Sequence, residues 1–228
     1  MATKRTEAAV KERLSRERIV DRAIALAETE GLEAVTIRRL AQDQGVTPMA
    51  LYWHFKDKEL LLEGIAERLL SEVVLPAAGS DKPWFEQLRE VLSVLLAALR
   101  AHPAVADLVK MRVLRSEPGL EITERALGLL RRGGFSAEQA AQLAIHALHS
   151  LVILVTQEPG LMVGEELAAR EERMRVKKAS FQSLSPERFP NMLASADAFT
   201  ECGNEPAYFE LGVDLFIQGV RGVQPAPG

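Results

Sequence analysis

The stretch from Thr36 to Lys58 constrains the fold of this 228-residue chain more than any other part. Thr36 is a favourable N-cap, and the apolar pair Leu40–Ala41 gives the helix that follows one side to bury. Gly45 ends this helix at a point where a positive φ angle costs little. The pattern therefore predicts a short helix and a tight turn.

A second short helix follows the turn. Thr47 caps it, and Pro48 lies in its first turn, where a missing N–H is harmless. Val46 and Leu51 are expected to point into a small core. That leaves an outward-facing set: Met49, Ala50, Tyr52 and His54. Two short helices joined by a tight turn are typical of the helix-turn-helix, which presents one helix to the major groove of DNA.

The rest of the chain predicts further helices and no sheet. Aromatic residues make up only 5% of the sequence and β-branched alternation is rare, which favours an all-α fold. Asp57 caps a helix predicted over 58–75, which Pro76 ends. The Glu-Pro-Gly segment at 117–119 is expected to separate two helices. The other predicted helices span residues 16–30, 84–101, 104–115, 120–132, 137–157, 165–179 and 206–222, and residues 180–206 hold at most short helices.

These elements divide the chain into three parts. Residues 1–15 predict a flexible arm, either solvated or inserted into a minor groove. Residues 16–64 predict a helix-turn-helix DNA-binding domain, and residues 65–228 a helical effector-binding and dimerisation domain. Residues 1–58 carry 11 Lys and Arg against 9 Asp and Glu, whereas the other 170 residues carry 17 against 23. The net charge of −4 argues against generic nucleic-acid binding, but this asymmetry places the positive end on the helix-turn-helix.

Cysteine usage and hydropathy indicate a cytoplasmic protein. The single cysteine, Cys202, allows no disulfide within the chain. The N-terminal segment has no apolar core and is not a signal peptide. No run of about 18 uninterrupted apolar residues occurs, so we expect no membrane span and no membrane partner. The sequence also lacks a phosphate loop, a nucleophile elbow and a metal-ligand cluster, which argues against an enzyme.

The helix-turn-helix residues resemble the N-terminal domain of the TetR family of bacterial repressors. The resemblance rests on a series in register: Thr36, Leu40–Ala41, Gly45–Val46–Thr47, Leu51–Tyr52, Phe55 and Lys58–Glu59–Leu60–Leu61. The triplet Tyr52–Trp53–His54 is similar to the end of the recognition helix in the tetracycline-responsive members. The match is strong over residues 17–70 and weaker through 134–136 and 208–219. It implies a homodimeric transcriptional repressor, cytoplasmic and associated with the nucleoid when bound to its operator.

By this resemblance nine residues fall on DNA-contacting positions: Ile37, Arg38, Thr47, Pro48, Met49, Ala50, Tyr52, His54 and Lys58. Arg38 can bond a phosphate or a guanine, and Met49 can touch thymine methyl groups. Tyr52, His54 and Lys58 suit phosphate contacts; ordinary surface packing is the alternative for Tyr52 and His54. Residues 48–50 offer few hydrogen bonds to base edges. The operator should therefore differ from that of the tetracycline-responsive members, and DNA shape should contribute more to its recognition.

The larger domain should hold a cavity for a small apolar effector, because such sites are apolar pockets with few polar groups. The candidate lining residues are Leu88, Leu92, Leu95, His102, Met111, Leu114, His146 and His149. Plain core packing is the alternative for most of them. His146 and His149 could share a metal, but no carboxylate or cysteine accompanies them, so no metal or cofactor is expected. The tetracycline-responsive members hold magnesium through a His, whose approximate counterparts here are Leu108 and Val109. A metal–tetracycline effector is therefore not expected.

Two helices predict contact between subunits. Helix 137–157 is apolar nearly all round, and helix 206–222 carries apolar residues at helical spacing, with Gly212 permitting a close approach. Together they resemble half of an intersubunit four-helix bundle, where TetR-family proteins dimerise. The candidate interface residues are Leu148, Leu151, Val152, Gly212, Val213, Phe216 and Val220. The pattern alone fits core helices of a monomer equally well.

The sequence thus predicts a homodimeric repressor that releases a palindromic double-stranded DNA operator when a small apolar molecule binds. One alternative is an all-α enzyme whose helix-turn-helix serves only for packing. Burial of Tyr52 and His54 would favour it. The other alternative is a DNA-binding regulator controlled by a protein partner, without a small-molecule effector. A filled core in place of a cavity would favour that one.

Overall fold

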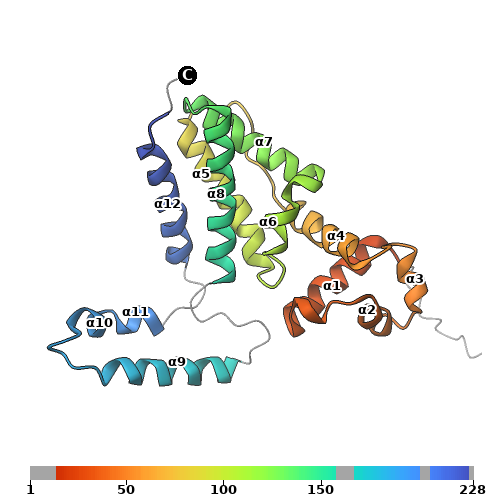
Figure 1. Cartoon of the computed structure of the whole chain (residues 1–228), viewed down its shortest axis with the longest axis horizontal. Helices are drawn as coiled ribbons and strands as arrows, with labels where there is room; N and C mark the ends of the chain where they lie inside the picture. The colour runs from red at the N-terminus through yellow and green to blue at the C-terminus, as the bar shows by residue number, and fades with distance from the viewer. Residues whose placement is uncertain (1–13, 158–166, 201–205, 226–228) are drawn as a thin grey trace, which may run out of the picture.

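The chain folds into a small helical head, a helical bundle and a separate helical arm (Figure 1). The structure is a computed structural model, and it describes residues 14–157, 167–200 and 206–225. Throughout these ranges the regular elements are α-helices and short 3-10 helices, so the predicted all-α fold is confirmed. The predicted arm at residues 1–15 falls almost wholly outside the described residues, as does Cys202.

The head consists of α1 (Arg16–Glu30), η1 (Leu32–Ala34), α2 (Ile37–Asp43), α3 (Pro48–Tyr52) and the first part of α4 (Lys58–Leu70). Its core contains the fully buried side chains of Leu51 and Phe55. Gly64 lets α4 approach closely, because a Cβ there would lie 3.1 Å from the Phe55 ring. The Arg16 guanidinium stacks on the same ring at 4.3 Å. This packing holds the α2–α3 pair against a rigid support.

The bundle consists of α5 (Trp84–Ala101), α7 (Glu117–Arg132), α8 (Ala137–Thr156) and α12 (Pro206–Gly222). Between the bundle and α4 lie α6 (Leu108–Arg112) and the 3-10 turn η2 (Val113–Arg115), which together replace the predicted helix 104–115 (Figure 1). Ser136 begins α8 with a capping box, in which its side chain and that of Gln139 each accept the other residue's N–H. Because α4 packs on α6, η2 and α7, it connects the head to the bundle.

Two predicted helix boundaries are wrong for local reasons. α4 ends at Leu70 and not at residue 75, because the N–H groups of Glu72 and Val73 donate to carbonyls only three residues back, a 3-10 pattern that closes the helix. α7 begins at Glu117, so the Glu-Pro-Gly segment forms its first turn and does not break the helix. Ser116 caps this turn, and Pro118 lacks only an N–H that would have no partner inside the helix.

The arm consists of α9 (Leu167–Gln182), α10 (Pro190–Ala194) and α11 (Ala196–Thr200), which lie to one side of the bundle (Figure 1). These helices pack on one another. The rings of Phe181 and Phe199 are 5.9 Å apart, and Lys178 pairs with Asp197 at 2.7 Å. The arm therefore has a small packed interior of its own.

α8 is long and apolar enough to meet the length and composition criterion of a membrane-spanning helix. Core helices of soluble proteins meet the same criterion, so this finding is weak evidence of a membrane. Here α8 packs against α5, α7 and α12. Part of its apolar surface is buried in the bundle, with Leu151 and Val152 at most 1% exposed.

Candidate functional site

The outer side of α3 carries large exposed side chains. Met49 is 66% exposed, Tyr52 44% and Trp53 85%. They face outward because Leu51, on the opposite side of the helix, is fully buried in the head core. Exposed large apolar side chains that gather on one short helix indicate a contact surface. Trp53 is absent from the predicted site residues; its only signal in the sequence is its place between Tyr52 and His54.

Three exposed basic residues lie near α3 in the chain and make no ion pair within the described residues. Arg38 lies on α2, Lys58 is the first residue of α4, and Lys56 directly precedes the Asp57 cap of that helix. By contrast, Arg39 pairs with Glu30 at 2.7 Å. Cations without an internal partner are available to phosphate groups of a nucleic-acid backbone.

The start of α4 offers a further group of donors. Asp57 caps the helix by accepting the N–H of Leu60 at 2.8 Å. The first-turn N–H groups of Lys58 and Glu59 have no carbonyl partner within the helix. A phosphate oxygen can accept from such N–H groups, and the helix dipole favours its negative charge.

Ile37 is corrected from a DNA-contacting residue to a core residue. Its side chain is only 7% exposed, because it shares the inner face of α2 with Leu40–Ala41. The other predicted contact residues not yet placed are exposed or half-buried: Thr47, Pro48, Ala50 and His54. Thr47 occupies the N-cap position of α3, but its side chain accepts no capping hydrogen bond.

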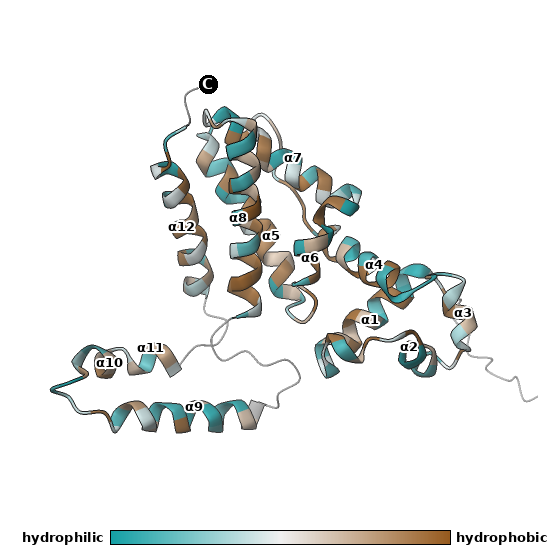
Figure 2. Ribbon diagram, viewed as in Figure 1, coloured by the Kyte–Doolittle hydropathy of each residue, from teal (hydrophilic) through white to brown (hydrophobic). Residues whose placement is uncertain are grey.

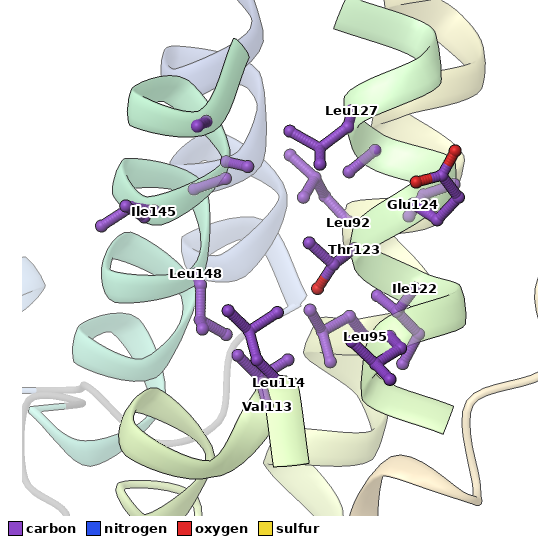
Figure 3. Close-up of a pocket in the computed structure, with 16 residues that line it drawn as sticks. Leu92, Leu95, Val113, Leu114, Ile122, Thr123, Glu124, Leu127, Ile145 and Leu148 are labelled. Atoms are coloured by element: carbon purple, nitrogen blue, oxygen red, sulfur yellow. The ribbon is translucent and has the colours of Figure 1, made fainter. Parts of the chain in front are cut away.

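An apolar cavity of about 340 Å³ lies between α5, α7, α8 and η2 (Figure 3). Its lining residues are Val91, Leu92, Leu95, Val113, Leu114, Leu120, Ile122, Thr123, Glu124, Ala126, Leu127, Ala141, Ala144, Ile145, Ala147 and Leu148. Only Thr123 and Glu124 are polar. The Thr123 hydroxyl donates to the Gly119 carbonyl at 2.8 Å, which leaves its lone pairs for a guest. A cavity of this size and lining suits a small organic molecule.

Three of the predicted pocket residues line this cavity: Leu92, Leu95 and Leu114. Leu88 and Met111 do not. Leu88 is 1% exposed and belongs to the core on another face of α5. Met111 is 75% exposed on α6. An apolar side chain can line the cavity, pack in the core or lie exposed on the surface. The sequence pattern does not distinguish these three environments, because all three occur along the same amphipathic helices.

None of the predicted histidines lines the cavity. On α8 the lining positions are residues 141, 144, 145, 147 and 148, whereas His146 and His149 lie on the exposed side. His102 follows α5, and its Nε2 lies 3.2 Å from a carboxylate oxygen of Glu72. Within the described residues no three His, Cys, Asp or Glu side chains gather as a metal site would require.

The turn η2 joins the cavity to the head. Its residues Val113–Leu114 line the cavity. The arginines on either side of this pair reach α4. Arg112 donates to Glu59 at 2.8 Å. Arg115 pairs with Glu63 and, at 3.4 Å, with Glu59. The Arg112 side chain is only 12% exposed, so its ion pair is better shielded from water than an ordinary surface pair. A displacement of η2 would therefore disturb the charges that hold α4.

A second contact joins α1 of the head to the loop after α5. Glu28 accepts the N–H of Ala104 at 3.3 Å. Burial raises the pKa of the Glu28 carboxyl above its ordinary value, while this hydrogen bond and the nearby His102 act in the opposite direction. The head is therefore attached to the bundle on both of its long helices, α1 and α4.

Four of the seven predicted interface residues are buried within the protomer, which leaves little of their surface for a second copy, whereas the assignments of Leu148, Gly212 and Phe216 stay predictions. Four are at most 3% exposed: Leu151, Val152, Val213 and Val220. Leu148 lines the cavity and Phe216 is half-buried. A Cβ on Gly212 would lie 2.5 Å from Leu154 Cδ1, so this glycine brings α12 close to α8 of the same chain. The reason is geometric: α8 and α12 are neighbours in the bundle and bury these faces against it.

A different set of apolar residues is exposed on the same two helices. Ile145 and Ile153 on α8 are 55% and 54% exposed, and Leu211 and Leu215 on α12 are 58% and 64% exposed. Figure 2 shows hydrophobic residues along both helices. Exposed apolar side chains on adjacent helices mark an interaction surface.

Comparison with known families identifies both parts of the chain. The model of bacterial regulatory proteins of the tetR family matches residues 19–65. The model of the tetracyclin repressor-like C-terminal domain matches residues 75–223. The chain belongs to the TetR family. It is therefore a helix-turn-helix transcriptional repressor and not an enzyme.

Individual TetR-family proteins are similar over nearly the whole chain. The class C tetracycline repressor of Escherichia coli is 30% identical over 210 residues, which cover 92% of this chain and 91% of that protein. The transcriptional repressor DrrR1 of Streptomyces coeruleorubidus is 29% identical, with 91% and 77% covered. The crystal structure of ActR from Streptomyces coelicolor in complex with actinorhodin is 27% identical, with a TM-score of 0.68 and 92% and 97% covered.

Proposed function

We propose that this TetR-family protein is a homodimeric repressor that releases a palindromic operator when a small apolar molecule occupies its cavity. The observation that carries the proposal is the position of η2. Its Val113–Leu114 pair lines the cavity, and the flanking Arg112 and Arg115 make ion pairs with α4. One short turn thus touches both the effector site and the helix that supports α3.

The DNA-binding surface combines α3 with the basic residues around it. Arg38, Lys58 and the hydroxyl of Tyr52 would contact phosphates and position the head. Met49 and Trp53, which are the most exposed side chains of this surface, would meet the bases or their methyl groups. Phosphate contacts carry no sequence information, so the apolar side chains and DNA shape would supply the specificity.

Dimerisation would use the exposed apolar residues of α8 and α12. A twofold interface uses the same surface of both subunits, so the interface would bury Ile153, Leu211 and Leu215 from each of the two chains. Two identical heads require a palindromic operator with half-sites about 34–36 Å apart. Such a dimer would be cytoplasmic and would lie on the nucleoid when bound to its operator.

The effector would act through a difference in affinity between two conformations. A guest that pushes on Val113–Leu114 would shift η2, weaken the pairs of Arg112 and Arg115 with α4, and change the spacing of the two heads. Coupling free energies of this kind are about 1–3 kcal/mol. The ActR complex with actinorhodin supports a ligand-responsive role, and a cavity in place of a filled core disfavours control by a protein partner alone.

Selection of bound DNA from a random pool, followed by footprinting, tests the DNA-binding part of the proposal. The expected product is a palindrome protected over two half-sites. Binding should also weaken by roughly 10³–10⁵-fold between about 50 and 200 mM salt if six to ten phosphates are contacted. Selection of an asymmetric site, or affinity that does not change with salt, would contradict the proposal.

A further inference from the structure

The polar groups around the cavity have one chemical character. Within the cavity lining only Thr123 and Glu124 are polar, and no lysine, arginine or histidine is present. The Thr123 hydroxyl already donates to Gly119, so it can only accept from a guest. An ionised Glu124 accepts hydrogen bonds and donates none. Every polar group that the cavity wall offers is therefore an acceptor, and one of them is an anion.

Glu124 stands where two cavities meet. An open cleft of about 870 Å³ lies on the other side of α7, between this helix, α5 and residues 75–79. Leu120 and Glu124 line both the cleft and the apolar cavity, so they form the boundary between them. In the view of Figure 3 the Glu124 carboxylate lies farther from α8 than Leu127 and Thr123 do, at the edge of the apolar group. A guest whose apolar part fills the cavity would place its polar end at this edge.

Three glutamates and two arginines line the adjacent cleft, which gives its lining a net charge of −1. The two arginines keep their charge but are held against neutral oxygens: Arg125 donates to the carbonyl of Pro76 at 3.0 Å, and Arg132 donates to Gln87 at 3.1 Å. Glu117, Glu121 and Glu124 recur on one face of α7, and none of these carboxylates has a hydrogen bond or ion pair within the described residues. An anionic end group would be repelled here and a cationic one attracted.

We propose that the effector is an amphipathic cation, with an apolar ring system in the cavity and a protonated amine beside Glu124. The inference rests on the proposed function and specifies its ligand class. It also gives Glu124 a defined role: its carboxylate decides the charge preference of the site, while the aliphatic wall provides most of the affinity.

The test uses three probes that share one ring system and differ in charge. The full-length protein is titrated near pH 7 with 9-anthracenemethylamine, 9-anthracenemethanol and 9-anthracenecarboxylic acid, and calorimetry gives each Kd. We expect the amine to bind about two- to fivefold more tightly than the alcohol, the range that a partly exposed ion pair supports. The acid should bind most weakly. The preference for the amine should also shrink as salt is added.

Two variants locate the origin of the preference. Glu124→Gln should make the Kd of the amine equal to that of the alcohol and leave the alcohol unchanged. Glu86→Gln is the matched control, because Glu86 is an exposed carboxylate on α5 that lines neither cavity. It should retain the full preference. Ala144→Phe, which fills the cavity, should weaken all three probes, and circular dichroism checks that each variant keeps its helical content.

The outcomes separate this inference from the proposed function. Three results would overturn the cationic ligand class: equal affinity for amine and alcohol, tightest binding of the acid, or an unchanged preference in Glu124→Gln. In each of these cases, probe binding that is lost in Ala144→Phe would still support the effector cavity. If none of the probes binds, or if Ala144→Phe changes nothing, the cavity is not a ligand site and the proposed function fails with the inference.

Discussion

Arg38 and Arg39 are neighbours on α2 with opposite surroundings. Arg38 is exposed and makes no ion pair within the described residues, whereas Arg39 pairs with Glu30 at 2.7 Å and with Asp43 at 3.6 Å. A paired guanidinium would have to give up its carboxylates before it could bind a phosphate. At the residue scale, therefore, the partners of a side chain and not its type determine whether it is available to DNA.

We expect Arg38→Ala and Arg39→Ala to differ in how operator affinity depends on salt. Each of the two subunits would lose one phosphate contact in Arg38→Ala, so the slope of log affinity against log salt should fall by about two units. Arg39→Ala should keep the wild-type slope. Fluorescence anisotropy over a salt series, with the selected operator, measures both slopes. A wild-type slope in Arg38→Ala would show that Arg38 does not contact a phosphate.

The raised pKa of Glu28 leads to a prediction about stability and pH. Burial makes ionisation of this carboxyl unfavourable in the folded state, so above its folded pKa the charge costs stability, and below its unfolded pKa the cost disappears. Glu28→Gln keeps an oxygen for the Ala104 N–H and removes the charge. We expect it to raise Tm near pH 7 by roughly 1–2 °C, corresponding to about 0.5 kcal/mol after solvent screening. The gain should vanish near about pH 4. Thermal melts at both pH values test this, and a gain that is larger at low pH would contradict it.

At the scale of elements, η2 is the shortest segment that contacts both the cavity and α4. It follows α6 directly and precedes the Ser116 cap of α7, so its position depends on both helices. A short 3-10 turn has few hydrogen bonds of its own to resist displacement. In the proposed mechanism, the ion pairs of Arg112 and Arg115 with Glu59 and Glu63 would link the effector site to the head.

Arg112→Met should weaken that link and leave both sites in place. Methionine retains the apolar stem that packs beneath α4 but cannot pair with Glu59. We expect ligand affinity to change little, while the ratio of operator Kd with and without ligand falls by about fivefold. Arg175→Met removes an Arg–Glu pair within α9 and is the matched control. Operator titrations with and without 9-anthracenemethylamine measure the ratio. An unchanged ratio in Arg112→Met would place the coupling elsewhere.

At the scale of the whole molecule, the bundle presents apolar residues that its own helices do not cover. The inward faces of α8 and α12 are used within the protomer, where Gly212 permits the close contact with Leu154. The outward faces carry Ile145, Ile153, Leu211 and Leu215. A second copy of the chain would cover these side chains in a twofold arrangement.

Leu215→Glu should therefore dissociate the dimer without unfolding the protomer. Leu215 is 64% exposed, so a carboxylate there is solvated in the monomer and buried without a partner in the dimer. We expect sedimentation to give a monomer, circular dichroism to give wild-type helical content, and operator affinity to fall by at least about tenfold because each half-site is bound alone. Glu210→Gln, at an exposed neighbouring position, is the control. A Leu215→Glu dimer would mean that another surface joins the subunits.

The sequence by itself determined the helix-turn-helix and the helical class. The caps, turn residues and apolar positions between Thr36 and Lys58 act over a few residues, so local physics is sufficient to predict them. The same holds for α5, α8 and α12, whose bounds agree with the predicted helices within one residue. Helix ends depend on weaker local preferences, and the predicted end at residue 75 and the predicted helix break at Pro118 are wrong.

Only the tertiary structure decided which face of each helix lines the cavity, which forms the core and which is exposed. Leu88 and Leu92 on α5 lie about one turn apart and His146 and Leu148 on α8 lie closer still, yet one of each pair lines the cavity and the other does not. Ile37 became core and Trp53 became surface for the same reason. A helical period states that a face is apolar but not which neighbour covers it, because burial depends on packing between segments far apart in the chain.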